Sequence, residues 1–137
     1  MQKTGSYNTT RKEKYLALGK SEEWIEERAE GIEKRKKFAD TLKEHEVEKQ
    51  GFGQCTNAVY VALLGNSAAG VKIRLGLTPK ANLRDSLSSE VLALVKVIET
   101  TSAAKIEKDR VTGNLSCAEV CKKTSQLIAE AVRKAME

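Results

Sequence analysis

Residues 21–47, SEEWIEERAEGIEKRKKFADTLKEHEV, decide the fold class because they predict one long amphipathic helix. Ser21 offers a hydroxyl that can cap the first turn, and acidic residues follow it at the positive end of the helix dipole. Apolar residues recur at three- and four-residue spacing along one narrow seam that includes Trp24, Ile25 and Phe38. So narrow a seam packs either along one side of a small domain or against a second copy as a coiled coil.

On the N-terminal side of this helix the pattern weakens. Residues 1–9 are small and polar and predict a flexible tail, and residues 11–18 predict a short helix that Gly19 ends. The first 20 residues are therefore expected to be an appendage of the long helix, and residues 51–137 are expected to form the helical domain.

Within residues 51–137 the first two segments are the least regular. The stretch 51–54 contains two glycines and predicts a turn, after which Thr56 and Asn57 could cap a short apolar helix over 58–64. Residues 71–75 alternate apolar and basic side chains, as a strand does, whereas Ser67 and the alanines after it indicate a helix start. The residue pattern alone leaves both alternatives open for this segment.

The last two helices are more regular. Serines at 86, 88 and 89 precede an apolar-periodic run to Ile106, and Ser116 with Glu119 fits a capping box at the start of a final helix. The sequence predicts an all-α fold, an irregular bundle of about five helices with a long charged N-terminal helix. We expect the inner stripe of the final helix to consist of Val120, Cys121, Thr124, Leu127, Ile128, Ala131, Val132 and Ala135.

Composition limits the chemistry. The chain has 137 residues, 40% hydrophobic and 31% charged, which suits one domain whose core, with 4% aromatics, is built mainly from aliphatic side chains. The longest apolar stretches are far shorter than a bilayer span, and the polar N-terminus does not resemble a signal peptide, so we expect a cytoplasmic protein. The net charge of +5 lies mostly in residues 51–137 and is compatible with weak attraction to nucleic acid or to an acidic protein.

Three cysteines and one histidine leave few routes to catalysis or metal binding. An odd number of cysteines argues against a disulfide framework. Cys117 and Cys121 share a helix face and could form a metal site with Cys55 and His45, but buried small side chains are the favoured interpretation. His45 is expected to cap a helix or lie at the surface. No nucleophile has a base beside it in the sequence, so we expect no enzyme, no cofactor and no metal.

A series of ordered landmarks carries a family resemblance over about residues 42–132. They are LKEH at 42–45, CTN at 55–57 with Tyr60, LG at 64–65, LGL at 75–77, NLRDSLS at 82–88, Glu90 with LA at 92–93, ETT at 99–101 and KI at 105–106. In these landmarks the chain resembles the C-terminal domain of DNA-damage-inducible protein D and of phage antirepressor-like proteins of the BRO family. The resemblance implies that residues 67–77 are helical and supplies no catalytic residues.

In that family a DNA-binding BRO or KilA-N domain usually precedes the helical part. This chain begins without one, so the resemblance implies a free-standing regulatory half of phage or mobile-element origin. The expected function is that of a non-enzymatic interaction module that binds and modulates a host protein of the DNA-damage, recombination or defence machinery. A homodimer through the long helix is an open alternative. No membrane association is expected.

The candidate residues follow from these two functional alternatives. The aromatic and aliphatic seam either binds a partner or packs in the core of the same chain, and the sequence leaves both alternatives open. A second candidate contact is the outward-facing arginine of the 82–88 turn, whose Asp85, Ser86 and Ser88 are expected to cap the next helix. The alternative is nucleic-acid binding without sequence preference, through the basic side chains. The partner-binding set is Trp24, Ile25, Phe38 and Arg84, and the nucleic-acid set is Lys34, Arg35, Lys36, Lys37, Lys72, Arg74, Lys80, Lys122 and Lys123.

Overall fold

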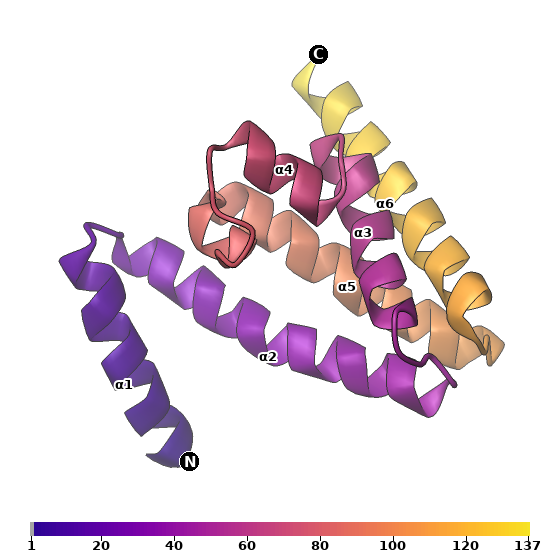
Figure 1. Ribbon diagram of the computed structural model, residues 1–137, viewed down its shortest axis with the longest axis horizontal. Coiled ribbons are helices and arrows are strands. Elements are labelled where there is room, and N and C mark those ends of the chain that lie inside the picture. The colour runs from indigo at the N-terminus through magenta and orange to yellow at the C-terminus, as the bar shows by residue number, and fades with distance from the viewer. Residues whose placement is uncertain (1) are drawn as a thin grey trace.

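The computed structural model describes the backbone of residues 2–137 and the side chains of residues 10–137. Within this part of the chain the fold is entirely helical and has six α-helices, one more than the five expected (Figure 1). A short 3₁₀ helix, η1, lies between α4 and α5. The elements are α1 (Gln2–Ala17), α2 (Glu22–Glu44), α3 (Gly51–Leu64), α4 (Ala68–Arg74), η1 (Leu83–Ser86), α5 (Ser89–Asp109) and α6 (Asn114–Met136).

The long helix α2 forms within the segment predicted for it, but it ends at Glu44 and not at Val47. The Ser21 hydroxyl accepts a hydrogen bond from the backbone N–H of Trp24 at 3.0 Å, which satisfies one of the free amides of the first turn. At the other end His45 is the C-terminal cap, and its backbone N–H donates to the carbonyl of Thr41. The expectation of a flexible tail over residues 1–9 is wrong for residues 2–9, because α1 runs without interruption from Gln2 to Ala17. Met1 lies outside the described residues.

The glycine-rich stretch at 51–54 is the first turn of α3 and not a separate turn. Gly51 is buried, and a Cβ built on it would lie 2.2 Å from the side chain of Asn114. That side chain accepts a hydrogen bond from the Glu48 N–H at 2.8 Å and donates to the Glu48 carbonyl at 3.2 Å. Glycine is therefore required here by the close approach of α6, and its helix-breaking tendency is overridden by tertiary contacts.

The segment with strand-like alternation is helix α4. Ser67 caps it by accepting from the Gly70 N–H at 3.3 Å, and the Asn57 side chain accepts from the Ala68 N–H at 3.0 Å. Gly65, with a φ of 87°, ends α3 in the left-handed conformation that glycine adopts readily. These local hydrogen bonds turn the chain from α3 into α4 and fix the two helices as a hairpin.

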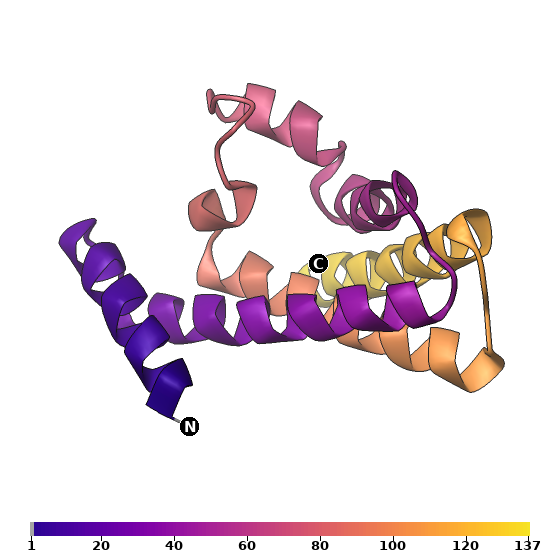
Figure 2. The ribbon, with the colours of Figure 1, turned by 60° about the horizontal axis from the view of Figure 1, so that its bottom comes forward.

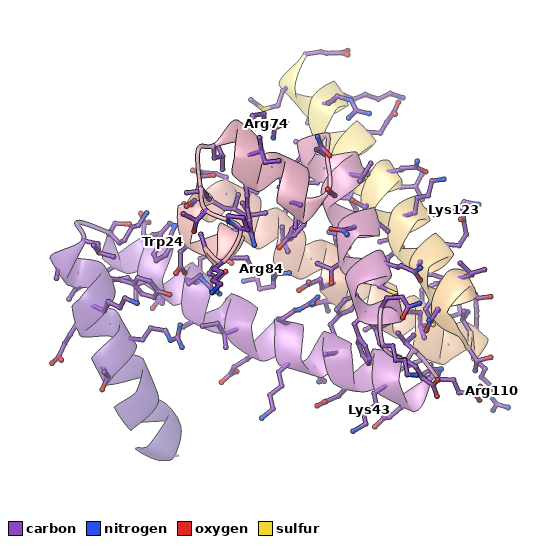
Figure 3. All side chains as sticks on the ribbon, viewed as in Figure 1. Trp24, Lys43, Arg74, Arg84, Arg110 and Lys123 are labelled. Carbon is purple, nitrogen blue, oxygen red and sulfur yellow. The ribbon has the colours of Figure 1, made fainter. Side chains whose placement is uncertain are left out.

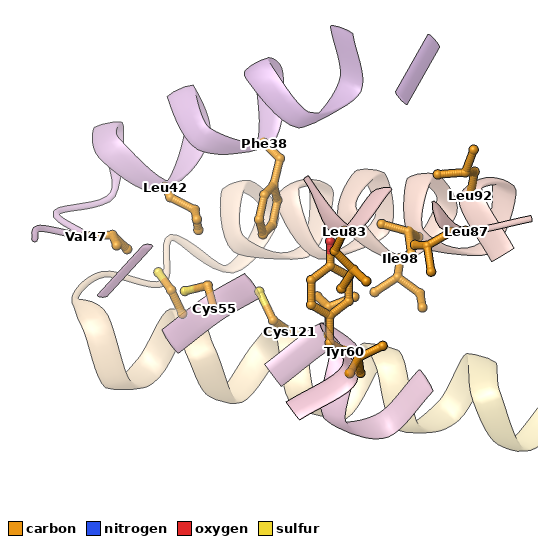
Figure 4. Close-up of a cluster of buried hydrophobic side chains, with 14 of the residues drawn as sticks. Phe38, Leu42, Val47, Cys55, Tyr60, Leu83, Leu87, Leu92, Ile98 and Cys121 are labelled. Atoms are coloured by element: carbon orange, nitrogen blue, oxygen red, sulfur yellow. The ribbon is translucent and has the colours of Figure 1, made fainter. Parts of the chain in front are cut away.

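Two helix pairs build the bundle. α2 packs along α5, α3 packs along α6, and α5 joins the two pairs by its contacts with α6. The chain from α3 through α4 to η1 forms an arch that faces α2 (Figure 2). The core between the pairs is aliphatic and sulfur-rich, as Figure 4 shows. Its fully buried side chains include Phe38, Leu42, Val59, Val95, Ile98 and Ile106.

The expected inner stripe of α6 is confirmed only in part, since Cys121 is buried and Val120 and Ile128 pack partly buried against the core. Leu127 is 65% exposed, and Ala131 and Ala135 are also exposed, because the helix turns a different row of small side chains toward α3. The close packing of α3 on α6 excludes larger residues from this face. The buried residues of α6 are Cys117, Cys121, Ser125 and Ala129.

The start of α6 also differs from the expected capping box. The helix begins at Asn114, with Gly113 as N-cap and no side-chain cap. Ser116 and Glu119 are exposed beyond that start, so they do not form the predicted box. Among residues 2–137 no helix has the length and apolarity needed to cross a membrane.

Candidate functional site

The turn that contains η1 is held by side chains from α1 and α2. The Trp24 indole N–H donates to the Leu87 carbonyl at 2.8 Å, in a buried position. The Asp85 carboxylate accepts from the Tyr15 hydroxyl and from Arg28 Nε, each at 2.9 Å. The expected capping role of Asp85 is therefore replaced by a role in joining three elements, whereas Ser88 does cap α5 by accepting from Val91 N–H at 3.2 Å. Ser86 belongs to η1 itself.

Arg84 does not face outward as expected. Its side chain is only 11% exposed and lies against Glu99, with 2.7 Å between Nη2 and Oε2. Arg35 approaches the same carboxylate oxygen from α2 at 3.1 Å. Burial acts to lower the pKa of Arg84, but the hydrogen bonds and the negative charge of Glu99 outweigh it, so the net pKa is raised and the guanidinium stays charged. Figure 3 labels Arg84 on this turn, with Trp24 on α2 nearby.

The three apolar residues expected as exposed partner anchors are part of the core. Trp24 is 6% exposed, Ile25 8% and Phe38 1%. They are covered because α2 packs lengthwise on α5 and because α1 and the η1 turn close over the first turns of α2. The periodicity of α2 correctly identifies an apolar face. This face is covered by other helices of the same chain and not by a binding partner.

The three cysteines come from two helices and interact with one another in the core, where Figure 4 labels Cys55 and Cys121. Cys55 of α3 and Cys117 and Cys121 of α6 have no exposed surface. Burial, with a smaller contribution from Cys55, raises the pKa of Cys117 to about 11, and a hydrogen bond with Cys55 together with burial raises the pKa of Cys121. The same hydrogen bond lowers the pKa of Cys55. Thiols without exposed surface are nevertheless poor nucleophiles, and the cluster serves the packing of α3 on α6.

This arrangement predicts slow thiol chemistry in the folded protein. Labelling of the three cysteines by an aromatic disulfide reagent at neutral pH is expected to be at least about 1,000-fold slower than in the unfolded chain, because each thiol reacts only when the core opens. Measuring the labelling rate with and without denaturant tests the prediction. A single thiol that reacts quickly in the native state would instead identify an accessible nucleophile.

His45 stabilises the end of α2 next to the α5–α6 turn. Its Nδ1 lies 2.8 Å from the Val111 carbonyl, and its own carbonyl accepts from the Gly113 N–H at 2.9 Å. The ring therefore ties the end of α2 to the turn before α6. Among the described side chains, those of residues 10–137, no group of three or more His, Cys, Asp or Glu residues has a geometry that could hold a metal ion.

The basic side chains of the nucleic-acid alternative lie on several faces. Successive residues of a helix are about 100° apart, so the run 34–37 encircles α2. Arg35 pairs with Glu99, and Arg74 donates to the Leu64 carbonyl at 2.8 Å, at the end of α3. Figure 3 shows Arg74 on α4 and Lys123 on α6, on separate helices. The remaining exposed members are Lys34, Lys36, Lys37, Lys80 and Lys122.

A cleft of about 500 Å³ lies between α2 and the α3–α4 hairpin. Ile73, which is 78% exposed, lines it together with the cationic side chains of Arg35 and Lys72. Lys72 is held at the rim because its Nζ donates to the Pro79 carbonyl at 3.0 Å. Within the part of the chain whose side chains are described, no acidic residue lines this cleft, which we call the α2–α4 cleft. Its described lining is Arg35, Gly53, Thr56, Asn57, Ala68, Ala69, Lys72, Ile73, Leu77 and Pro79.

Only part of this cleft could be anticipated. Arg35 and Lys72 belong to the basic residues of the nucleic-acid alternative, and the structure places both beside one apolar surface. Ile73 was not expected to have a role, although one signal was present: a large apolar residue flanked by two basic ones.

Comparison with known proteins gives no further guidance, since the chain matches no family model and no curated protein. The similarity to the C-terminal domain of DNA-damage-inducible protein D therefore stays a prediction. A functional assignment has to come from the side chains themselves.

Proposed function

We propose that this protein is a non-enzymatic interaction module that binds a partner protein through the α2–α4 cleft. The supporting observation is the combination in one cleft of an exposed apolar side chain, Ile73, with two cationic groups and, among residues 10–137, no acidic ones. A partner segment with an apolar side chain next to a carboxylate complements this surface in both shape and charge.

The side chains that could act in catalysis are buried or already paired within the protein, which supports a binding role over a catalytic one. The three thiols are buried, His45 is bound to a backbone carbonyl, and the Glu99 carboxylate is taken up by two arginines. Each of these groups is used to join helices. The proposed partner is a host protein of the DNA-damage, recombination or defence machinery, and this choice rests on the family resemblance alone.

The proposal is tested by placing a photo-cross-linking amino acid at position 73 in cells that naturally encode the protein. A discrete cross-linked protein is expected at this position and not at position 115. Leu115 is the matched control because it is an equally exposed apolar residue, 79% accessible, at the start of α6. Cross-linking to nucleic acid, or equal products at both positions, would contradict the proposal.

Charge reversal gives a second, quantitative prediction. Lys72→Glu is expected to weaken binding of the captured partner by about tenfold or more, since a cation that faces an acidic segment becomes an anion. Lys122→Glu, which makes the same charge change on exposed α6, is expected to leave the affinity within about twofold. Affinities measured by fluorescence anisotropy or calorimetry check this prediction, and equal effects of the two substitutions would exclude the cleft as the binding site.

A further inference from the structure

α6 presents an apolar stripe that the rest of the bundle covers only in part, since Val120 and Thr124 are half-buried and Leu127 and Ala131 are exposed. Val120, Thr124, Leu127 and Ala131 follow one another at spacings of four, three and four residues, so they lie on one face of the helix. Leu127 at the centre of this stripe is 65% exposed. The core-facing residues of α6 lie on another face, toward α3. We call the four residues the α6 stripe.

A shallow groove continues the apolar surface toward α5. Its volume is about 430 Å³, and it is lined by Thr101 and Lys105 of α5 and by Val120, Lys123, Thr124, Leu127 and Ile128 of α6. Val97, which is 47% exposed, lies one helical turn before Thr101 and extends the same surface. Contiguous exposed apolar surface of this kind is typical of protein–protein contacts.

Charged side chains follow the edge of the α6 stripe that lies away from the core. Their order favours a second copy of α6 as the binding partner. From the N-terminal to the C-terminal end this edge carries Glu119, Lys123, Glu130 and Lys134, all of them exposed. From the C-terminal to the N-terminal end the signs of these four charges are the opposite at every position. A second α6 lying antiparallel would therefore face Lys123 with Glu130 and Glu119 with Lys134, and two-fold symmetry would form each pair twice.

We propose that α6 forms the interface of a two-fold symmetric homodimer, with the α6 stripe of one copy packed antiparallel on that of a second copy. In antiparallel coiled coils equivalent edges face each other, so the charged edges meet and form complementary pairs. In a parallel pair the charged edge would face the edge with Ile128 and Ala135, which has no carboxylate and no cation.

The ion pairs that Glu130 forms within its own chain compete only weakly with pairing to a second copy. Glu130 lies 3.3 Å from Arg133 and 3.8 Å from Lys134, and all three side chains are more than half exposed. Pairs of this kind contribute little in water, so Glu130 is free to reorient toward a second copy. Of the residues whose side chains are described, none lines both this surface and the α2–α4 cleft, so the dimer is independent of the proposed function.

The dimer is tested with the full chain by sedimentation over micromolar to submillimolar concentrations. The wild type is expected to dimerise, and Leu127→Asp is expected to be a monomer with an unchanged circular dichroism spectrum. Leu115→Asp, an exposed control on the same helix, is expected to remain a dimer. A monomeric wild type over the whole range, or a dimer that persists in Leu127→Asp, would overturn the proposal.

Charge exchange tests the antiparallel orientation without changing the apolar stripe. Lys123→Glu is expected to raise the dimer dissociation constant by about tenfold, since two ion pairs become two repulsive contacts. Adding Glu130→Lys to this variant restores both pairs and is expected to return the constant to within about threefold of the wild type. A double variant that is weaker than Lys123→Glu alone would overturn the antiparallel pairing.

Discussion

Replacing Glu99 by alanine is expected to lower the free energy of unfolding by about 3–5 kcal/mol, the largest single effect of any charged residue in this protein. The Glu99 carboxylate is fully buried and accepts from Arg84 at 2.7 and 3.3 Å and from Arg35 at 3.1 Å. The variant leaves the buried guanidinium of Arg84 without its counter-ion, which is the costly step. Arg35 is one-third exposed and can turn to water, so its contribution is smaller.

Urea unfolding followed by circular dichroism measures this change. Asp109→Asn is the matched control, because Asp109 lies on the same helix but forms an exposed pair with Lys105, and it is expected to change stability by less than about 0.5 kcal/mol. Replacing Glu99 by leucine together with both arginines by methionine is expected to recover most of the loss, because no buried charge is then left unpaired. A Glu99→Ala variant as stable as the control would show that the cluster contributes nothing to the fold.

The helices themselves could largely be predicted from the sequence. Ser21 and Ser88 are followed by apolar periodicity, and both cap helices as expected, because capping is a local interaction between residues a few positions apart. The alternation at 71–75 is ambiguous because so short a stretch cannot distinguish the period of a strand from that of a helix. In that segment the cap at Ser67 was the informative signal.

The burial of charged and glycine residues could not be predicted in the same way. Arg84 and Glu99 are 15 residues apart, and Arg35 and Glu99 are 64 apart, so no local pattern announces their pairing. Gly51 indicates a break by its intrinsic propensity, and the proximity of the Asn114 side chain explains why a residue without a Cβ begins α3. Amphipathicity shows that a face is apolar but does not show whether the same chain or another one covers it.

Substitution of Trp24 tests whether the apolar face of α2 is covered by the same chain or by another one. Trp24→Ala is expected to lower the free energy of unfolding by about 3–5 kcal/mol, because the indole is 6% exposed and its removal leaves a large cavity under α1 and the η1 turn. The ring also packs edge-on against Tyr15, with 4.9 Å between centroids, and lies under the Lys20 ammonium at 4.6 Å. Hydrogen exchange in residues 10–17 is therefore expected to rise as α1 detaches.

Trp24→Phe separates packing from hydrogen bonding. It keeps most of the apolar volume but removes the indole N–H, so the buried Leu87 carbonyl loses its donor, at an expected cost of about 1–3 kcal/mol. Circular dichroism is the suitable probe, because the chain has no other tryptophan to report by fluorescence. Leu18→Ala, at a residue that is 66% exposed, is the control and is expected to change stability by less than about 0.5 kcal/mol. If Trp24 were instead an anchor for a partner, Trp24→Ala would leave the isolated protein as stable as this control, since binding energy lost with a partner does not affect the unfolding of the free chain.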